Sequence, residues 1–293
     1  MAEVDRLQRQ LLQAQNADGG WGYFRGNNSW TETTAFALLA LESLALLGDP
    51  HARGCAWLAR NQRSDGGFPP NPEVHVSTWV TSLAALALSK RPSYAARHRS
   101  AVQWLVAAIR PEADFLERVI ARLRGPAGAV QPPGGSPWFP HTAAWLTPTA
   151  MSVLALSDAA QGRTDPTLNA CVRQAQAYIL SCRCLDGGWN HGGSRYLSEN
   201  AASYPETTGM ALLALPRAST PEISTALRLA EAYLRAPGSV EALSWLQLAL
   251  VRHGRTIELS ETNLRPHTTR DISLRLLALT GSSPSNKMMK AIA

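Results

Sequence analysis

The segment QNADGGW at residues 15–21, followed by WTETTAFALLAL at 30–41, decides the fold because the pair recurs along the chain. The Asp of the second turn, Asp65, lies 47 residues after Asp18. A fixed spacing of this size is typical of proteins built from repeated supersecondary units. Two further clear copies are WLARNQRSDGGF at 57–68 before STWVTSLAALAL at 77–88, and YILSCRCLDGGW at 178–189 before YPETTGMALLAL at 204–215.

Three weaker copies fill the rest of the chain. They are QPPGGSPW at 131–138 before WLTPTAMSVLAL at 145–156, YLRAPG at 233–238 before VEALSWLQLAL at 240–250, and HTTRDISLRLLAL at 267–279. Six copies agree with the number that 293 residues hold at a spacing of 47. The repeat therefore predicts one domain over residues 1–293.

Each copy predicts two helices of different character. The segment before the turn carries a narrow apolar stripe among charged residues, which in the first copy consists of Val4, Leu7, Leu11 and Leu12. The segment after the turn is apolar nearly all round, as in AFALLAL at 35–41. Because such a helix has to be covered on every side, we expect inner helices surrounded by outer helices.

The turn residues predict how the chain reverses between the two helices. Glycine supplies the left-handed backbone that ends a helix, and Asp18 accepts hydrogen bonds from the exposed amides. Gln15 is expected to bond carbonyls left open at the helix end. Trp21 is expected to cover the seam between repeats.

Six helical hairpins form either a closed ring or an open solenoid, and an open array needs polar terminal units. The last copy is only partly polar, with Arg270, Asp271 and Arg275, which favours closure. We therefore predict an all-α fold, an (α/α)6 toroid with inner and outer rings of helices. An insert at about 110–145 breaks the period, with an amphipathic helix at 110–124 and a loop at 125–137.

Composition limits the function classes. With 45% apolar and 17% charged residues, the chain folds rather than staying disordered. The net charge is +6, but the Arg residues are scattered and form no basic block, so no nucleic-acid partner is expected. Four cysteines form no disulfide framework, the first ten residues are too polar for a signal peptide, and no stretch is long enough to span a membrane. We expect a cytoplasmic protein; contact of the insert with a membrane surface stays open.

The repeated Gln-x-x-Asp-Gly-Gly-Trp turn with its Ala/Leu-rich helix resembles the repeat of the squalene-hopene cyclase and protein prenyltransferase β-subunit superfamily. The resemblance covers most of the chain. It implies a terpenoid cyclase-like toroid with an aromatic-lined central cavity that accepts isoprenoid chains. Cyclases of this family pair two such domains, so a partner subunit or a homodimer is a further expectation.

The resemblance also points to the acidic residues. Class II terpene cyclases protonate an alkene or epoxide with an Asp from a D-x-D-D-T-A motif at the start of an inner helix. The matching stretch here is Trp30–Ala35, where Glu32 takes the acidic position, and Glu206 repeats it; Val240-Glu241 is a fainter echo. A second interpretation stays open, in which each Glu stabilises the positive end of its helix and Ser29 or Thr31 caps the first of them.

Metal chemistry is not predicted. Zinc prenyltransferases use Asp, Cys and His at the starts of inner helices, and no Asp-x-Cys pair occurs at those places here. Cys182 and Cys184, with Asp186 and His191, lack the usual spacing of a zinc site. We therefore expect no metal and no cofactor.

Residues just ahead of the inner helices are the candidate lining of the mouth, where the inner helices begin. Aromatic rings there suit an apolar substrate and stabilise carbocations, and histidines from different repeats suit proton transfer. The candidate substrate-binding residues are Trp30, His75, Trp79, His141, Trp145, Tyr204 and His267.

These features favour an isoprenoid-handling enzyme that resembles class II terpene cyclases, with Glu32 or Glu206 as the general acid. Two alternatives stay open: a toroid that binds an isoprenoid or another hydrophobic ligand without catalysis, and a protein-interaction scaffold. Substrate length and recognition of a diphosphate do not follow from the sequence.

Overall fold

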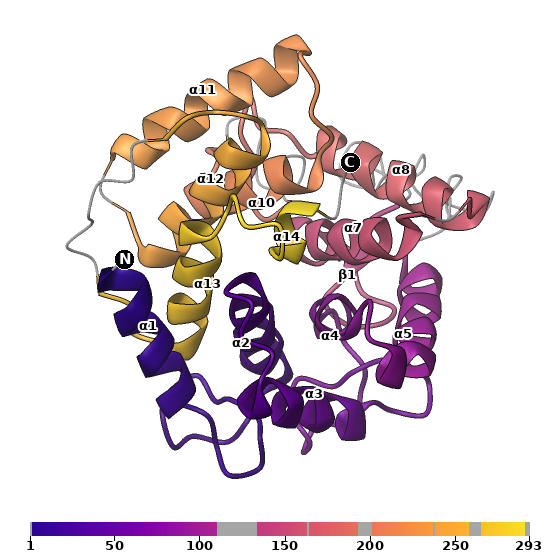
Figure 1. Ribbon diagram of the computed structural model, residues 1–293. Helices are drawn as coiled ribbons and strands as arrows, with labels where there is room; N and C mark the ends of the chain where they lie inside the picture. The colour runs from indigo at the N-terminus through magenta and orange to yellow at the C-terminus, as the bar shows by residue number, and fades with distance from the viewer. Residues whose placement is uncertain are drawn as a thin grey trace.

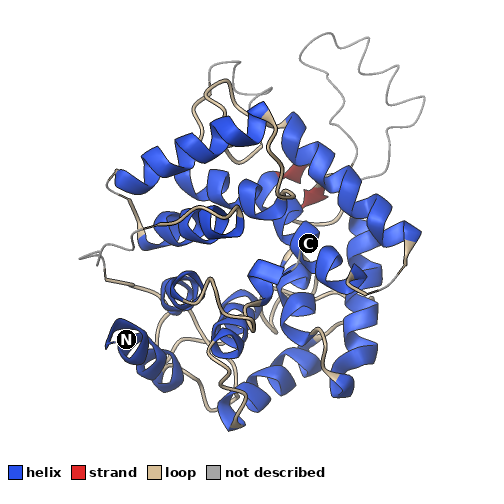
Figure 2. Cartoon of the chain, turned by 45° about the horizontal axis from the view of Figure 1, so that its top comes forward, coloured by secondary structure: helices blue, strands red, loops and turns tan. Residues whose placement is uncertain are grey.

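The computed structural model describes residues 2–109, 134–162, 164–192, 201–236, 238–257 and 265–290. The predicted helix at 110–124 and most of the predicted loop at 125–137 lie outside these residues. Figures 1 and 2 show two views of a ring of helices, drawn in blue in the second, with a short strand pair in red at its side.

Six helices form a closed inner ring. Each contacts the next in chain order, and the last packs against the first, α13 on α2, which closes the ring (Figure 1). The predicted all-α toroid is therefore confirmed. The ring consists of α2 (Thr31–Ser43), α4 (Val80–Leu88), α7 (Leu146–Ala160), α10 (Pro205–Ala214), α12 (Val240–Arg252) and α13 (Thr269–Leu279).

Outer helices cover the ring, each packed on the inner helix of the preceding repeat. Thus α3 packs on α2, α5 on α4, α8 on α7, α11 on α10, and α1 on α13, on the far side of the closure. Within the described residues, α13 is not preceded by an outer helix of its own. The outer helices are α1 (Ala2–Gln13), α3 (Asp49–Asn61), α5 (Ala95–Ala108), α8 (Pro166–Ser181) and α11 (Pro221–Arg235).

Burial separates the two kinds of helix as the apolar patterns predicted. In α2, 12 of the 13 residues are buried. In α1, Leu7 and Leu11 are completely buried, while Val4 and Leu12 pack against the core at its margin. An all-round apolar helix is stable only when other elements surround it, and here two inner neighbours and an outer helix do so.

The double-glycine turns have one backbone geometry in four repeats. The first Gly of each pair has a left-handed φ: 92° at Gly19, 88° at Gly66, 94° at Gly134 and 94° at Gly187. Residues with a side chain avoid this region. The agreement at Gly134 shows that the weak copy QPPGGSPW forms the same turn as the clear copies.

Asp and Gln of the turn tie neighbouring repeats together. Asp18 accepts hydrogen bonds from Gly20 N at 2.9 Å and from the Trp57 ring nitrogen, on the next outer helix, at 2.8 Å. Gln15 donates to the carbonyls of Gly19 and Pro50 at 2.9 and 2.7 Å. The Gln therefore links its own turn to the next outer helix, instead of completing the end of its own helix as predicted.

Smaller elements complete the described chain. The 3-10 helix η1 (Pro92–Tyr94) precedes α5, and strands β1 (Ser136–Pro137) and β2 (Ala144–Trp145) pair antiparallel within the insert. The short helix α14 (Lys287–Lys290) contacts α2 and α7. None of the helices in the described ranges has the length and apolar character needed to cross a membrane.

Candidate functional site

Threonines fix how each inner helix begins. Thr34 Oγ1 accepts a hydrogen bond from Trp21 N at 2.9 Å, and Thr208 Oγ1 accepts one from Trp189 N at 3.1 Å. In two other repeats Thr81 and Thr149 accept the equivalent amide, each at 2.8 Å. Because the turn holds the helix start through the same bond, the residues beside these threonines occupy equivalent places around the ring.

The position two residues before Thr34 is equivalent in all six inner helices when their Leu-Ala-Leu ends are aligned. In ring order from α2 it is occupied by Glu32, Trp79, Thr147, Glu206, Glu241 and Arg270. The charged members lie on consecutive helices, α10, α12, α13 and α2. We call Glu206, Glu241, Arg270 and Glu32 the charged arc.

Direct contacts hold most of the charged arc together. Arg270 Nε lies 2.9 Å from Glu32 Oε1, and Arg270 Nη2 donates to Glu241 Oε1. Tyr23, from the loop before α2, donates its hydroxyl to Glu32 Oε2. One guanidinium therefore bridges carboxylates from two different helices, while the remaining oxygen of Glu32 is bonded by a phenol.

The electrostatics of the three groups follow from this geometry. Burial raises the pKa of Tyr23, and the negative charge of Glu32 raises it further. Burial also raises the pKa of Glu241; Arg270 opposes this effect, while Glu32, Glu206 and Asp271 add to it. Burial works against the charge of Arg270, but the carboxylates of Glu32 and Glu241 raise its pKa.

The capping predicted beside Glu32 does not form, whereas stabilisation of the positive helix end by Glu32 itself stays an open interpretation. No side chain caps α2, because the Ser29 hydroxyl donates to Asp18 at 2.8 Å and the Thr31 hydroxyl donates to the carbonyl of Pro69 at 2.6 Å. The interpretation in which Ser29 or Thr31 caps this helix is therefore wrong. Both hydroxyls instead stabilise contacts between the turn, the helix start and the next repeat.

The candidate aromatic residues sit at the helix starts. Trp30, Trp145 and Tyr204 are the N-cap residues of α2, α7 and α10, and none of them caps its helix with a side-chain hydrogen bond. In the last two inner helices Ser239 and Thr268 do cap. A missing cap costs about 1 kcal/mol, so the three rings occupy positions where they do not serve helix stability.

Two aromatic pairs lie beside these helix starts. Tyr23 packs edge-on against Trp30, with ring centroids 5.6 Å apart, and Trp79 packs edge-on against Trp138 at 4.9 Å. Trp145 and Tyr204 expose 39% and 44% of their surface. Exposed rings of this size at the ends of buried helices are available to an apolar ligand.

The three candidate histidines are not brought together by contacts. His75, His141 and His267 are exposed, and in the ranges that the structure describes no contact joins two of their side chains. The backbone amide of His267 donates to Asp271, which forms a capping box with Thr268 at the start of α13. A joint role for the three histidines stays a prediction.

Sequence reasoning gave too little weight to several residues. Tyr23, Trp138 and His191 lie in loops, each two residues after the turn residue whose amide bonds the inner-helix threonine, and the ring of His191 is 5.3 Å from that of Tyr204. The repeat already places Arg270 at an inner-helix start that corresponds to that of Glu32. The sequence does not show that Arg270 pairs with Glu32 and Glu241, because these residues lie on three different helices.

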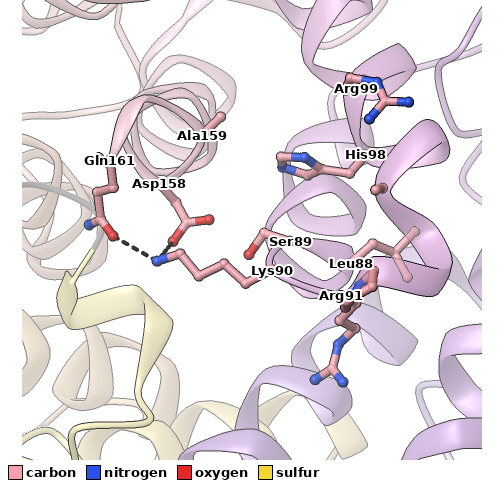
Figure 3. A pocket seen from close by; sticks show the side chains of 11 residues that line it. Leu88, Ser89, Lys90, Arg91, His98, Arg99, Asp158, Ala159 and Gln161 are labelled. Carbon is pink, nitrogen blue, oxygen red and sulfur yellow. Dashed lines mark hydrogen bonds and ion pairs between the residues drawn. The ribbon is translucent and has the colours of Figure 1, made fainter. Parts of the chain in front are cut away.

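A pocket of about 380 Å³ lies at the other end of the ring, where α4 and α7 end and α5 begins (Figure 3). Lys90 reaches across it, 2.8 Å from Asp158 Oδ1, and donates to Gln161 at 2.6 Å. Arg91, His98 and Arg99 add further polar surface. A pocket lined by these charged side chains does not suit a hydrocarbon chain. None of the predicted site residues lines this pocket.

The helix α14 packs over this same end of the ring. Lys287 Nζ lies 3.0 Å from Glu42 and donates to the carbonyl of Ser89 at 2.8 Å, so it joins the ends of α2 and α4. Figure 1 shows α14 within the outline of the inner ring. The opposite end, with the charged arc and the aromatic rings, is therefore the candidate mouth; the central cavity itself stays a prediction.

Buried sulfur does not form a metal site. Cys182 and Cys184 are buried, and burial raises the pKa of Cys184. In the part of the chain that the structure covers, no three His, Cys, Asp or Glu side chains gather so that they can hold a metal ion. Asp186 instead accepts hydrogen bonds from Gly188 of its turn and from Ser203. Burial opposes its charge, but these hydrogen bonds lower its pKa.

Comparison with known proteins places these features in context. Residues 1–116 match the family model of the prenyltransferase alpha-alpha toroid domain. Over 65 residues the chain is 40% identical to drimenyl diphosphate synthase from Streptantibioticus cattleyicolor, and over 72 residues it is 37% identical to the enzyme of that name from Streptomyces showdoensis. These alignments cover 22% and 24% of this chain, but 12% and 14% of those relatives.

Solved structures share the fold over nearly the whole chain. The type II terpene cyclase MstE from Scytonema, in complex with merosterolic acid A, is 18% identical with a TM-score of 0.58, over 97% of this chain and 80% of that one. The family 8 glycosyl hydrolase Cel10 from Klebsiella pneumoniae is 14% identical with a TM-score of 0.62, over 96% and 99%. The resemblance that the DGGW turns predicted is thus confirmed: the first 116 residues match the prenyltransferase toroid family, and the chain has the α/α toroid fold of type II terpene cyclases.

Proposed function

We propose that the protein is an isoprenoid-handling enzyme resembling class II terpene cyclases, in which a carboxyl group of the charged arc protonates a polyprenyl substrate. The observation that carries this proposal is the arrangement of the mouth. Glu32, Glu206 and Glu241 lie at equivalent starts of inner helices, and their helices belong to a run of four consecutive members of the ring. Trp79 is the N-cap residue of α4, which lies opposite α12, the helix of Glu241, in the ring order.

This arrangement suits the chemistry of alkene protonation. A strong carboxylic acid needs neighbours that stabilise its conjugate base, and Arg270 provides such a neighbour for Glu32 and Glu241. The cation formed on the substrate needs a wall of aromatic rings, which stabilise positive charge through their quadrupoles. Trp79, Trp138 and Trp145 supply such rings away from the charged arc.

The relatives support the same class of reaction. Two are drimenyl diphosphate synthases, and a protein of the same fold is a type II terpene cyclase in complex with its product. Because a glycosyl hydrolase also shares the fold, the likeness of fold does not select the substrate. The acids and aromatic rings of the mouth are what favour an isoprenoid.

The test is to incubate the protein with linear C15 and C20 isoprenoid alcohols and their diphosphates, and to analyse the extracts by gas chromatography with mass spectrometry. We expect cyclic products, and no cleavage of soluble cello-oligosaccharides in a parallel assay. Glu32→Gln, Glu206→Gln and Glu241→Gln are then compared with the wild type. Turnover unchanged in all three variants would overturn the assignment of the acid to the charged arc.

Wild-type protein that binds these isoprenoids but leaves them intact would support a non-catalytic toroid instead. Mass spectrometry of lipids that co-purify with the protein measures binding independently of turnover. The partner subunit, the homodimer and the contact with a membrane surface remain predictions, which size-exclusion chromatography with light scattering and vesicle sedimentation test directly.

A further inference from the structure

We propose that Glu241 is the carboxyl group that carries the transferable proton, and that Arg270, held by Glu32, which Tyr23 bonds in turn, is the positioning residue that stabilises the carboxylate left on Glu241. This inference rests on the proposed function and names the acid within it. It changes the role predicted for Glu32, from proton donor to anchor of the guanidinium.

The contacts of Glu32 suit an anchor of the guanidinium. Both of its carboxylate oxygens are engaged, Oε1 by Arg270 Nε at 2.9 Å and Oε2 by the hydroxyl of Tyr23. The side chain of Glu32 is 12% exposed. Both oxygens therefore already have a partner, and these contacts fix the side chain in place against the guanidinium.

Glu241 has a different environment. Among the described residues, its carboxylate is engaged by a single side chain, Arg270, and through Oε1. The charged groups that act on it come from three other inner helices: Arg270 and Asp271 from α13, Glu32 from α2 and Glu206 from α10. One positive charge therefore meets three negative ones, and together with burial this raises the pKa of Glu241.

The position of Arg270 matches what a proton donor needs. Before transfer, the guanidinium is held by its ion pair with Glu32, at 2.9 Å. After transfer it already lies against the new carboxylate of Glu241, so no group has to move. A neutral acid whose conjugate base is stabilised in advance is a stronger donor than an isolated carboxyl group.

Proton transfer leaves a negative charge on Glu241 and a positive charge on the substrate. The O–H bond of Glu241 breaks and its electron pair stays on the carboxylate, while the alkene π electrons bond the proton to one carbon. The other carbon is left positive, near the aromatic rings on the opposite side of the ring. The cyclised cation later loses a proton to water, and Glu241 regains one from solvent.

Glu206 is a weaker candidate for the donor. It lies on α10, next to α12 in the ring, and acts on Glu241 as a negative charge. Its own side chain is only half-buried, and the described contacts place no cation against it. Its conjugate base therefore lacks the stabilisation that Arg270 gives to Glu241.

The test measures cyclisation rates from pH 4 to 9 for four variants. We expect Glu241→Gln to lower the rate by about 10²- to 10⁴-fold, the usual contribution of a general acid, and Glu241→Asp to restore part of it. In the wild type the rate falls as pH rises through the pKa of the donor. Glu32→Gln removes a negative neighbour and moves this fall to lower pH, whereas Arg270→Gln removes the positive neighbour and moves it to higher pH.

Two controls separate chemistry from folding. Arg270→Lys keeps the charge, so the fall stays near its wild-type pH even if the rate is reduced. Glu222→Gln changes an exposed Glu in the first turn of the outer helix α11 and leaves the rate unchanged. Turnover retained in Glu241→Gln, or a fall that moves in the same direction in Glu32→Gln and Arg270→Gln, would overturn the inference.

A measurement without substrate keeps the inference distinct from the proposed function. Titration of side-chain-labelled Glu carboxyl groups by ¹³C NMR should show one resonance with a raised pKa, which is absent in Glu241→Gln. If that resonance is present but the wild type forms no product, the proposed function fails and the protonation assignment stands. If no such resonance is lost in Glu241→Gln, the assignment itself fails.

Discussion

The double-glycine turn allows a quantitative test of how repeats are locked together. Gly19 and Gly26 both have left-handed backbones, with φ of 92° and 84°. A Cβ added at Gly19 would lie 2.8 Å from the carbonyl oxygen of Arg53, on the next outer helix, whereas one added at Gly26 meets nothing within 4 Å. Ala substitutions at the two positions therefore share the backbone strain but differ in the clash.

The magnitudes follow from these two terms. A side chain in the left-handed region costs about 1–2 kcal/mol, and this is the expected loss for Gly26→Ala. The clash at Gly19 is with backbone that a rotamer change cannot relieve, and overpacking of this kind costs about 1–3 kcal/mol. Gly19→Ala should therefore lower the free energy of unfolding by about 2–5 kcal/mol.

Equilibrium unfolding in urea, followed by far-ultraviolet circular dichroism, measures both values. Because the change in unfolded-chain entropy is the same for the two Gly-to-Ala replacements, the difference between them isolates the contact of the turn with α3. The same effect is expected for Gly66→Ala, where the added Cβ would lie 2.7 Å from the carbonyl oxygen of Ser100. Equal destabilisation by Gly19→Ala and Gly26→Ala would refute the view that close approach, and not φ alone, requires glycine in this turn.

Three further predictions concern the other end of the ring. Lys287→Met removes an ion pair with Glu42, which keeps its pair with Arg91, and should destabilise the protein by about 1.5–3 kcal/mol, the usual contribution of a hydrogen bond to a charged group, whereas Lys290→Met, at an exposed site, should have little effect in the same urea titration. Burial lowers the pKa of His51 from 6.5 to about 4, so the unfolded chain binds the proton first as the pH falls. The free energy of unfolding should therefore fall by about 1.4 kcal/mol per pH unit between pH 6.5 and 4. A smaller fall in His51→Gln, measured by thermal melts, would support this origin. Burial also raises the pKa of Cys55 to about 11, so iodoacetamide at pH 8 should label it only in denaturant, and rapid labelling of the native protein would contradict its placement.

Much of the fold could be predicted because its signals are local. The all-round apolar helices, the striped helices and the double-glycine turns each depend on residues close together in the sequence, and even the weak copy at Gly134 keeps the turn geometry. The aromatic residues ahead of the inner helices were predicted for the same reason, since Trp30, Trp145 and Tyr204 all lie at the same point of the repeat.

The partners of the candidate acids could not be predicted in this way. The choice between Glu32 as a donor and Glu32 as an anchor depends on Arg270, which lies 238 positions later in the sequence. The Asp18 and Gln15 contacts show the same limit on a smaller scale, because their second partners lie on the next outer helix. A pattern within one repeat gives no information about which repeat packs beside it.

The sequence by itself determined a chain of repeated helical pairs with buried inner helices, because periodicity and glycine geometry act over a few residues. Ring closure was decided by the tertiary structure, which packs α13 against α2 and α1 against α13. Closure brings Arg270 between Glu32 and Glu241 and places Lys287 over the opposite end. These charges lie far apart along the chain, and packing of the inner helices into a closed ring is what makes them neighbours.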